Sequence, residues 1–417
     1  MSVTALKPSP KKTCLGRSTP KHRAPETAPL GRDFALLCVG QTVSQVGSRG
    51  FGVAIALMTL AATGSAATVG LVSSVAIGAF TVAQLPAGRI SDRFDRRRVM
   101  LVCDVGSALA VGSLVPMAFQ LPLVLVVVVA SVLAISWAVR GTAENAAVPN
   151  TVDDAQLPRA ITLIHGRGYA TGIAGPLLAG GLFVIAPTLP FLLDAWSYLV
   201  AAGCAALVRR PLRADPRPGR VLGGPTDGFR TIWRQPYLRL ATLVTSATGF
   251  VISCSGLILV IVLDRHGVQP STIGLAVTAT YVGGLAGTVL TRAGGRVVAP
   301  NNVIITGLAV GALATGLLVT ASPVAVGVGC CLLLLAQPLW GIPLATGWAR
   351  LVPDGSRGRA DAAIGLVVAI PSAVAPAIVG LIVEIATPAM VGLLLTALIG
   401  VTALVAASGL RPGRVVI

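Results

Sequence analysis

The sequence predicts an all-α integral membrane protein with twelve transmembrane helices in two pseudo-symmetric six-helix halves. Of its 417 residues, 54% are hydrophobic and 11% are charged, whereas a soluble protein carries about 25% charged residues. Apolar runs recur along the chain, and each is long enough to cross a bilayer, which takes about 20 residues. Basic residues gather in alternate connections between these runs. These three observations together predict the fold class.

The predicted spans follow one another from residue 34 to residue 408. Their ranges are 34–62, 67–87, 99–119, 122–143, 159–186, 189–208, 239–263, 271–292, 301–320, 324–348, 362–384 and 388–408. The connections after spans 1, 3, 5, 9 and 11 are short and uncharged, whereas those after spans 2, 4, 6, 8 and 10 carry Arg. An even number of spans places both termini on one side, and the positive-inside rule assigns that side to the cytoplasm.

The chain is expected to divide into two bundles joined by a basic linker. The expected segments are a basic cytoplasmic tail without fixed structure (1–33), an N-terminal bundle (34–208), a cytoplasmic linker (209–236), a C-terminal bundle (237–410) and a short cytoplasmic tail (411–417). Within the linker, Phe229–Arg234 is expected to form a short amphipathic helix on the lipid surface. An internal repeat relates the halves, because Thr68–Leu71 opens the second span and Thr272–Leu275 opens the eighth.

The positive charge follows membrane topology and does not indicate a nucleic-acid partner. The net charge is +17, but all except four of the 32 Lys and Arg residues lie in the tails, in the alternate connections or at adjoining helix ends. The seven Cys residues show no metal-ligand spacing, so no metal site is expected. The sequence contains no phosphate-binding Gly-x-x-x-x-Gly-Lys-Ser/Thr and no zinc-protease or serine-hydrolase motif. We therefore expect neither an enzyme nor a bound cofactor.

A short polar segment, Gly88–Arg98 (GRISDRFDRRR), separates the second and third spans. Gly88 would permit a tight turn, and Asp92 would accept the free N–H groups of a neighbouring helix. Arg93 and Arg97 would pair with carboxylates on adjacent helices. These four residues are predicted to act as a conformational latch that closes in one state and breaks in another. The alternative is a solvated basic loop that only sets topology.

Two motifs resemble signatures of the major facilitator superfamily. Gly88–Arg98 resembles the family's loop 2–3 signature, Gly-x-x-x-Asp-Arg-x-Gly-Arg-Arg/Lys-x, with Asp95 in place of the second Gly. In span 5, Gly175–Gly181 (GPLLAGG) is similar to the antiporter signature Gly-Pro-x-x-Gly-Gly, with Ala179 in place of one Gly. Gly175, Pro176 and Gly180 are therefore expected to shape the span 5 interface. The alternative is generic packing of small residues.

Two further segments look like parts of small-molecule and siderophore exporters in this superfamily. They are Ala143–Pro149 followed by Asp153 and Asp154, and Val352–Asp354 with Arg357–Arg359. The resemblance implies export of a small organic molecule, a drug or secondary metabolite, across the bacterial cytoplasmic membrane. It also implies alternating access, proton antiport in place of a cofactor, and action as a monomer within the lipid bilayer. Two alternatives stay open: an importer or uniporter of the same fold, and a non-transporting membrane sensor.

Polar residues inside the spans are candidates for the substrate cavity. Gln41 and Gln45 share one helical face with two Ser residues, and Arg49 lies beside that face. Arg167 lies in the inner part of span 5. These four residues are predicted to line the cavity, and the embedded Arg residues favour an anionic or electronegative substrate. The alternative for Arg49 is a structural ion pair.

Four acids within or near the ends of spans are candidate proton carriers, namely Asp104, Glu144, Asp194 and Glu384. Ionisable residues inside a membrane are functional candidates by default, and the sequence does not choose among these four. Glu144 lies one helical turn from Arg140, so the two are expected to form a structural or a gating pair. Exporters of the superfamily often carry an acid on span 1, where this chain has Ser48.

Overall fold

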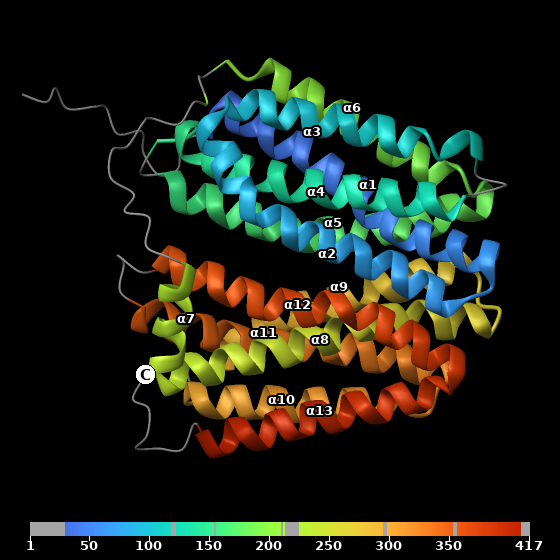
Figure 1. Cartoon of the computed structure of the whole chain (residues 1–417), viewed down its shortest axis with the longest axis vertical. Coiled ribbons are helices and arrows are strands. Elements are labelled where there is room, and N and C mark those ends of the chain that lie inside the picture. Colours follow the sequence, from blue (N-terminus) through green and yellow to red (C-terminus); the bar gives the residue numbers. More distant parts are fainter. Residues whose placement is uncertain are drawn as a thin grey trace, which may run out of the picture.

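In the computed structural model the described part of the chain is almost entirely α-helical (Figure 1). The structure describes residues 30–117, 122–153, 156–209, 212, 225–294, 298–352 and 357–409, and none of these forms a β-strand. The helices are α1 Arg32–Thr63, α2 Ala66–Arg93, α3 Arg96–Gly112, α4 Leu123–Ala147, α5 Leu157–Ile185, α6 Leu189–Leu207, α7 Pro225–Arg234, α8 Pro236–Arg265, α9 Pro270–Gly294, α10 Pro300–Leu318, α11 Pro323–Leu351, α12 Arg357–Ile385 and α13 Pro388–Gly409. The predicted all-α membrane fold is confirmed.

Within the described ranges, eleven helices are long and apolar enough to cross a membrane. The predicted span 99–119 is the exception, because α3 has only 17 residues and ends at Gly112. A 3₁₀ turn, Val115–Met117, follows it. Glycine and proline are poor helix formers, and Gly112 and Pro116 lie at this break. α3 would extend about 25 Å, and it packs against α4 and α6.

The helices form two bundles, α1–α6 and α8–α13, which lie side by side (Figure 1). We call one end of the molecule the basic end: there α2 joins α3, α6 ends and α8 begins. The opposite end, with the connections at residues 64–65, 186–188 and 386–387, is the distal end. The largest hydrophobic core fills the second bundle and continues into α1 and α2 of the first, through Leu57, Leu60 and Val69.

The linker between the bundles contains a helix, α7, that begins four residues before the predicted Phe229–Arg234. Ile232 is fully buried in the core, whereas Phe229 and Trp233 are exposed. The helix packs on α8 and α12. Linker residues 210–211 and 213–224 lie outside the described residues, as do residues 1–29 and 411–417 of the predicted tails and residue 410.

The polar segment between α2 and α3 forms a much shorter loop than predicted. α2 continues to Arg93 and α3 begins at Arg96, which leaves only two residues between them. Asp95 starts α3, since its carboxylate accepts a hydrogen bond from the backbone N–H of Arg97 at 2.9 Å. Gly88 lies inside α2, and a Cβ there would meet no atom within 4 Å. The prediction that Gly88 permits a turn is therefore wrong, because the reversal occurs at Phe94–Asp95.

Candidate functional site

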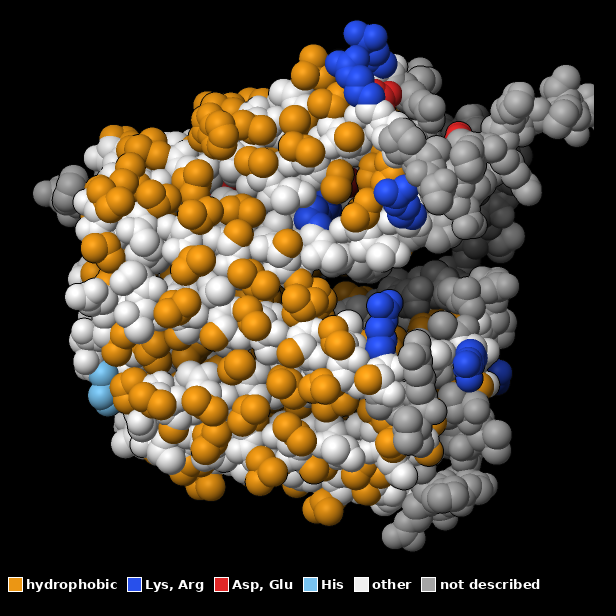
Figure 2. Space-filling view, turned by 180° about the vertical axis from the view of Figure 1, so that it is seen from behind, with side chains coloured by type: hydrophobic (Ala, Val, Ile, Leu, Met, Phe, Trp, Pro, Cys, Tyr) orange, Lys and Arg blue, Asp and Glu red, His pale blue; other side chains and the backbone are white. Residues whose placement is uncertain are grey.

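A cavity of about 610 Å³ lies towards the basic end, lined mainly by the second bundle and, among the described residues, by Tyr169 alone of the first. Figure 2 shows the surface hollowed between the bundles at the end where Arg side chains gather. The lining is mostly apolar and aromatic, and besides Tyr and Trp it has four uncharged hydrogen-bonding side chains: Thr245, Thr248, Thr288 and Gln337. None of the described lining residues is charged. The cavity walls come from α5, α8, α9, α11 and α12.

The bundles meet closely through two helix pairs, α2 with α12 and α5 with α9. In the first pair, Gly70 lies against the carbonyl of Pro376, and Gly380 lies against the carbonyl of Ala66. In the second pair, Gly274 lies against the carbonyl of Pro176. A Cβ on Gly180 would lie 2.7 Å from the carbonyl oxygen of Pro270. A larger residue at any of these glycines would push the backbones of the two bundles apart.

The α2–α12 contact and the α5–α9 contact are equivalent, and the repeated Thr-x-Gly-Leu sequence supplies the same glycine to each. Gly70 and Gly274 occupy the same place in the repeated Thr-x-Gly-Leu sequence, at the starts of α2 and α9. Their partners, Pro176 with Gly180 and Pro376 with Gly380, have the same spacing of four residues. The sequence analysis missed this second copy on α12. The available signal was a proline followed four residues later by glycine.

The predicted span 5 residues divide between two interfaces. Pro176 and Gly180 face the other bundle, as described above. Gly175 instead packs within its own bundle, because a Cβ there would lie 2.6 Å from the carbonyl oxygen of Val46 on α1. Pro176 lies inside α5. Small residues at these positions therefore allow α5 to approach α1 on one side and α9 on the other.

Hydrogen bonds also join the bundles, one of them between α1 and α9 and the others along the same two helix pairs. They are Arg49 Nη1 to Tyr281 Oη (3.1 Å), Tyr169 Oη with Thr288 Oγ1 (3.1 Å), Thr278 Oγ1 to the Ile173 carbonyl (3.0 Å) and Ala377 N to Ser74 Oγ (2.8 Å). Glu384, at the end of α12, adds a contact at the distal end. Its Oε2 accepts hydrogen bonds from the backbone N–H groups of Ala66 (3.0 Å) and Ala67 (3.4 Å). Glu384 therefore caps the N-terminus of α2 from the other bundle.

Arg49 lies between two aromatic rings from different bundles. Its guanidinium carbon is 5.3 Å from the ring centre of Trp137 and 5.5 Å from that of Tyr281. Such distances permit cation–π attraction. Arg49, Gln41 and Gln45 line a separate small chamber between α1, α3, α4 and α6, and none of them is among the described lining residues of the large cavity.

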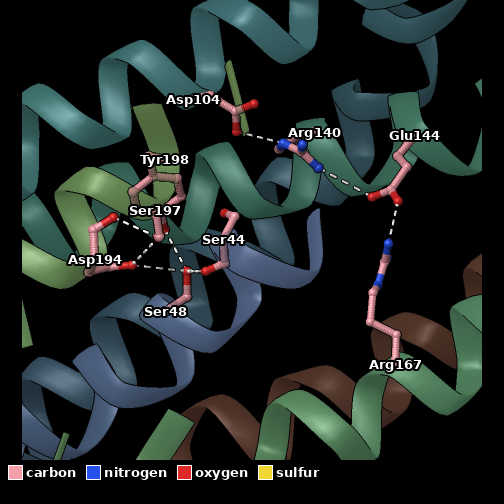
Figure 3. Close-up of polar contacts among 9 residues, drawn as sticks. All are labelled: Ser44, Ser48, Asp104, Arg140, Glu144, Arg167, Asp194, Ser197 and Tyr198. Atoms are coloured by element: carbon pink, nitrogen blue, oxygen red, sulfur yellow. Dashed lines mark hydrogen bonds and ion pairs between the residues drawn. The ribbon is translucent and has the colours of Figure 1, made fainter. Parts of the chain in front are cut away.

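The predicted acids and embedded arginines of the first bundle form one ion-pair network (Figure 3). Asp104 on α3 lies 2.5 Å from Arg140 on α4, and Arg140 lies 3.2 Å from Glu144. Glu144 also lies 2.8 Å from Arg167 on α5. All four side chains are buried. The two arginines are neutralised by two carboxylates, so Arg140 and Arg167 give no support to the expectation of an anionic substrate.

Asp194, near the distal start of α6, belongs to a second group in Figure 3. Its Oδ1 lies 3.5 Å from the hydroxyls of Ser48 and Ser197. Ser48 also lies 2.8 Å from the hydroxyl of Tyr198. Within the described residues, Asp194 has no ion-pair partner and its Oδ2 has no hydrogen-bond partner. The structure thus places an α6 acid beside Ser48 of α1.

The signature segment at the basic end binds backbone carbonyls of its own bundle. Arg97 donates to the carbonyl of Ala206 on α6, and Arg96 donates to the carbonyl of Ala146 on α4 at 2.9 Å. The guanidinium carbon of Arg93 lies 5.9 Å from the ring centre of Phe94. The prediction that Arg97 pairs with a carboxylate is replaced by this carbonyl contact. The residues Asp154, Pro353 and Asp354 of the exporter-like segments lie outside the described residues.

Comparison with known proteins places this architecture among transporters. A family model described as Major Facilitator Superfamily matches residues 37–376. The chain is 28% identical over 253 residues to multidrug efflux pump Tap of Mycobacterium tuberculosis, covering 56% of this chain and 59% of the relative. It is 27% identical over 185 residues to macrolide efflux protein A of Streptococcus pyogenes, covering 44% and 46%. The chain therefore spans less than two thirds of the length of these relatives.

Solved structures share the fold. The nucleoside transporter NupG superposes with a TM-score of 0.74 at 11% identity, covering 91% of this chain and 99% of the other. A bacterial homologue of the iron transporter ferroportin, in an inward-facing state, gives a TM-score of 0.69 at 16% identity, covering 91% and 99%. At these identities the likeness concerns the fold alone.

Proposed function

The chain belongs to the Major Facilitator Superfamily, and on this premise we propose that it exports a small organic molecule by alternating access, in exchange for protons. It is a multi-pass membrane transporter and not an enzyme. Efflux pumps among its relatives support the proposed direction. The proposal places it as a monomer in the bacterial cytoplasmic membrane, with both termini cytoplasmic and no bound cofactor.

One observation carries the proposal: a drug-sized cavity, lined by the second bundle and by Tyr169 of the first, lies towards the basic end, whereas the close backbone contacts between the bundles lie towards the distal end. The positive-inside rule assigns the basic end to the cytoplasm, so this conformation would receive substrate from the cell. Rocking of the bundles about the midplane would break the distal contacts and release substrate outside.

The cavity lining favours an amphipathic substrate that is uncharged when bound. A volume of about 610 Å³ lies in the range of about 300–1,000 Å³ typical of sites for drug-sized ligands. Tyr169 and Trp348 offer aromatic surface, and Gln337 offers an amide. Because a buried charge needs a counter-charge, the uncharged lining disfavours a cation or an anion.

Export is tested in a bacterium that lacks its own exporters. Cells with the protein, or with an empty vector, receive a macrolide, a tetracycline, an uncharged dye, ethidium and an anionic dye. Lower accumulation, restored to the vector level by a protonophore, is the expected result for at least the uncharged dye. Higher accumulation would instead support the import alternative. Unchanged accumulation of every compound, at equal membrane protein levels, would contradict transport of this substrate class and favour the sensor.

A pair of tryptophan substitutions tests the cavity itself. Ala345 is exposed and lines the cavity, so Ala345→Trp should fill it and reduce export about tenfold or more. Leu313 on α10 is 75% exposed and is not among the cavity-lining residues, so Leu313→Trp should leave export unchanged. Equal export by both variants would show that the substrate does not pass through this cavity.

A further inference from the structure

Asp194 is a buried acid that has no cationic partner among the described residues. It is completely buried, and the described part of the chain places no Lys, Arg or His within 4.0 Å of its carboxylate. Its close approach to α1 depends on Gly47, because a Cβ there would lie 2.6 Å from Asp194 Oδ1. An isolated carboxylate in a membrane interior is costly. The other three candidate acids have partners: Asp104 and Glu144 bind arginines, and Glu384 binds the α2 backbone.

The small chamber between α1, α3, α4 and α6 connects Asp194 to the ion-pair network. Its volume is about 10 Å³, close to the minimum of about 10–15 Å³ that holds one water. Ser48 and Tyr198, which lie next to Asp194, form part of one wall, and Ser107 and Arg140 form part of another. Polar side chains therefore surround a space of the size of one water molecule.

Unpartnered atoms gather around this chamber. Within the described residues, Ser107 Oγ and Gln41 Oε1, from two of its lining residues, are buried without a hydrogen-bond partner. Asp104 Oδ2 is also buried without a partner, one helical turn from Ser107. Buried polar atoms normally have a protein or a water partner. An ordered water in the chamber would supply a partner to the two lining atoms.

We propose that this chamber holds a water molecule that joins Asp194 to Asp104, and that Asp194 binds the transported proton. The proton leaves the Asp194 carboxyl and passes along the Ser48 and Tyr198 hydroxyls and the water. Each of these accepts one proton and releases another, so none changes its net charge. The proton arrives on Asp104 Oδ2. Arg140 stays protonated and keeps Glu144 as its partner when Asp104 becomes neutral. This inference rests on the proposed proton antiport.

The charged groups around this path are few. α1 contributes Arg49, α3 contributes Asp104 and α4 contributes Arg140, while Arg167 of α5 acts through Glu144. Arg49 follows Ser48 in sequence and is held by Tyr281 of the other bundle. Separation of the bundles would release Arg49 from Tyr281. The position of Arg49 therefore depends on the contact between the bundles.

Infrared spectroscopy of the protein in lipid vesicles tests the inference without any substrate. We expect a C=O band of a protonated carboxyl that persists above the pH at which exposed acids ionise. The band should disappear in Asp194→Asn and remain in Asp264→Asn, a half-buried acid in the other bundle. A wild-type spectrum without this band, or a band retained in Asp194→Asn, would overturn the proposal. Either result leaves export itself standing, because export is measured separately.

A second variant tests the chamber while leaving every ion pair intact. Ser107→Val places an extra methyl group in the chamber and removes an unpartnered hydroxyl, so the fold should tolerate it. We expect exchange of the Asp194 proton for deuterium to slow about tenfold or more. The matched control is Ser131→Val on α4, whose hydroxyl bonds within its own helix. An unchanged exchange rate in Ser107→Val would overturn the water connection.

Discussion

Two buried arginines of the first bundle, Arg140 and Arg167, are each paired with a carboxylate. Asp104, Arg140, Glu144 and Arg167 come from three helices and are all buried. The sequence showed one of these contacts, the pair one helical turn apart on α4, because that contact depends only on helix geometry. The contacts to Asp104 and Arg167 depend on which helices are neighbours in the bundle, and hydropathy does not contain that information.

At this scale we predict that Arg140→Leu destabilises the protein strongly, since it leaves two carboxylates buried with one arginine. Removal of one member of a buried ion pair typically costs about 3–5 kcal/mol, measured here as the free energy of unfolding in an SDS titration. The exposed Arg239→Leu on α8 serves as the control and should change little. Addition of Asp104→Asn to Arg140→Leu should recover part of the loss. Equal stability of Arg140→Leu and Arg239→Leu would contradict the network.

Among the secondary-structure elements, hydropathy located the long spans well and located their ends poorly. Polar residues of the Gly88–Arg98 segment remain helical as far as Arg93, because a helix can continue beyond the apolar core of the bilayer. α3 was predicted too long, since valine and proline after Gly112 extend the apolar run but not the helix. The repeat at the starts of α2 and α9 was visible in the sequence. The matching segments on α5 and α12 are related only by the contacts that they make with α9 and α2, and these contacts depend on how the helices pack.

The two glycine contacts yield a matched prediction for these elements. Gly70→Val and Gly274→Val should each prevent close approach of the bundles, because the new side chain would meet the carbonyl of Pro376 or Pro176. Both variants should shift the population towards a distal-open state. Spin labels on Thr63 and Thr387, exposed residues of the two bundles at this end, measure the shift as a longer distance. Gly78→Val on α2 is the control, since a Cβ there meets nothing within 4 Å.

The molecule as a whole combines an uncharged cavity with a buried acid that lies apart from it, in the first bundle. Exchange of one proton for one uncharged molecule carries one positive charge inward in each cycle, so export should respond to membrane potential as well as to pH. A pH difference of about one unit and a potential of about 60 mV each supply about 1.4 kcal/mol. In proteoliposomes with the uncharged dye, this pH difference and this membrane potential, applied separately, should drive about equal accumulation of the dye. Accumulation that does not change with membrane potential would contradict the inward movement of one net positive charge in each cycle.

The paired glycine contacts also bear on the ancestry of the chain. In a symmetric dimer of one bundle, the α2–α12 contact and the α5–α9 contact would be a single contact made twice. Fusion of two gene copies would free each contact to diverge, and the proline of one copy now follows Gly175 while that of the other follows Ala375. The glycines that touch the opposite backbone are still present in both copies. A dimeric ancestor with half this length would thus already have had the glycine–backbone contacts that hold the two bundles together at the distal end.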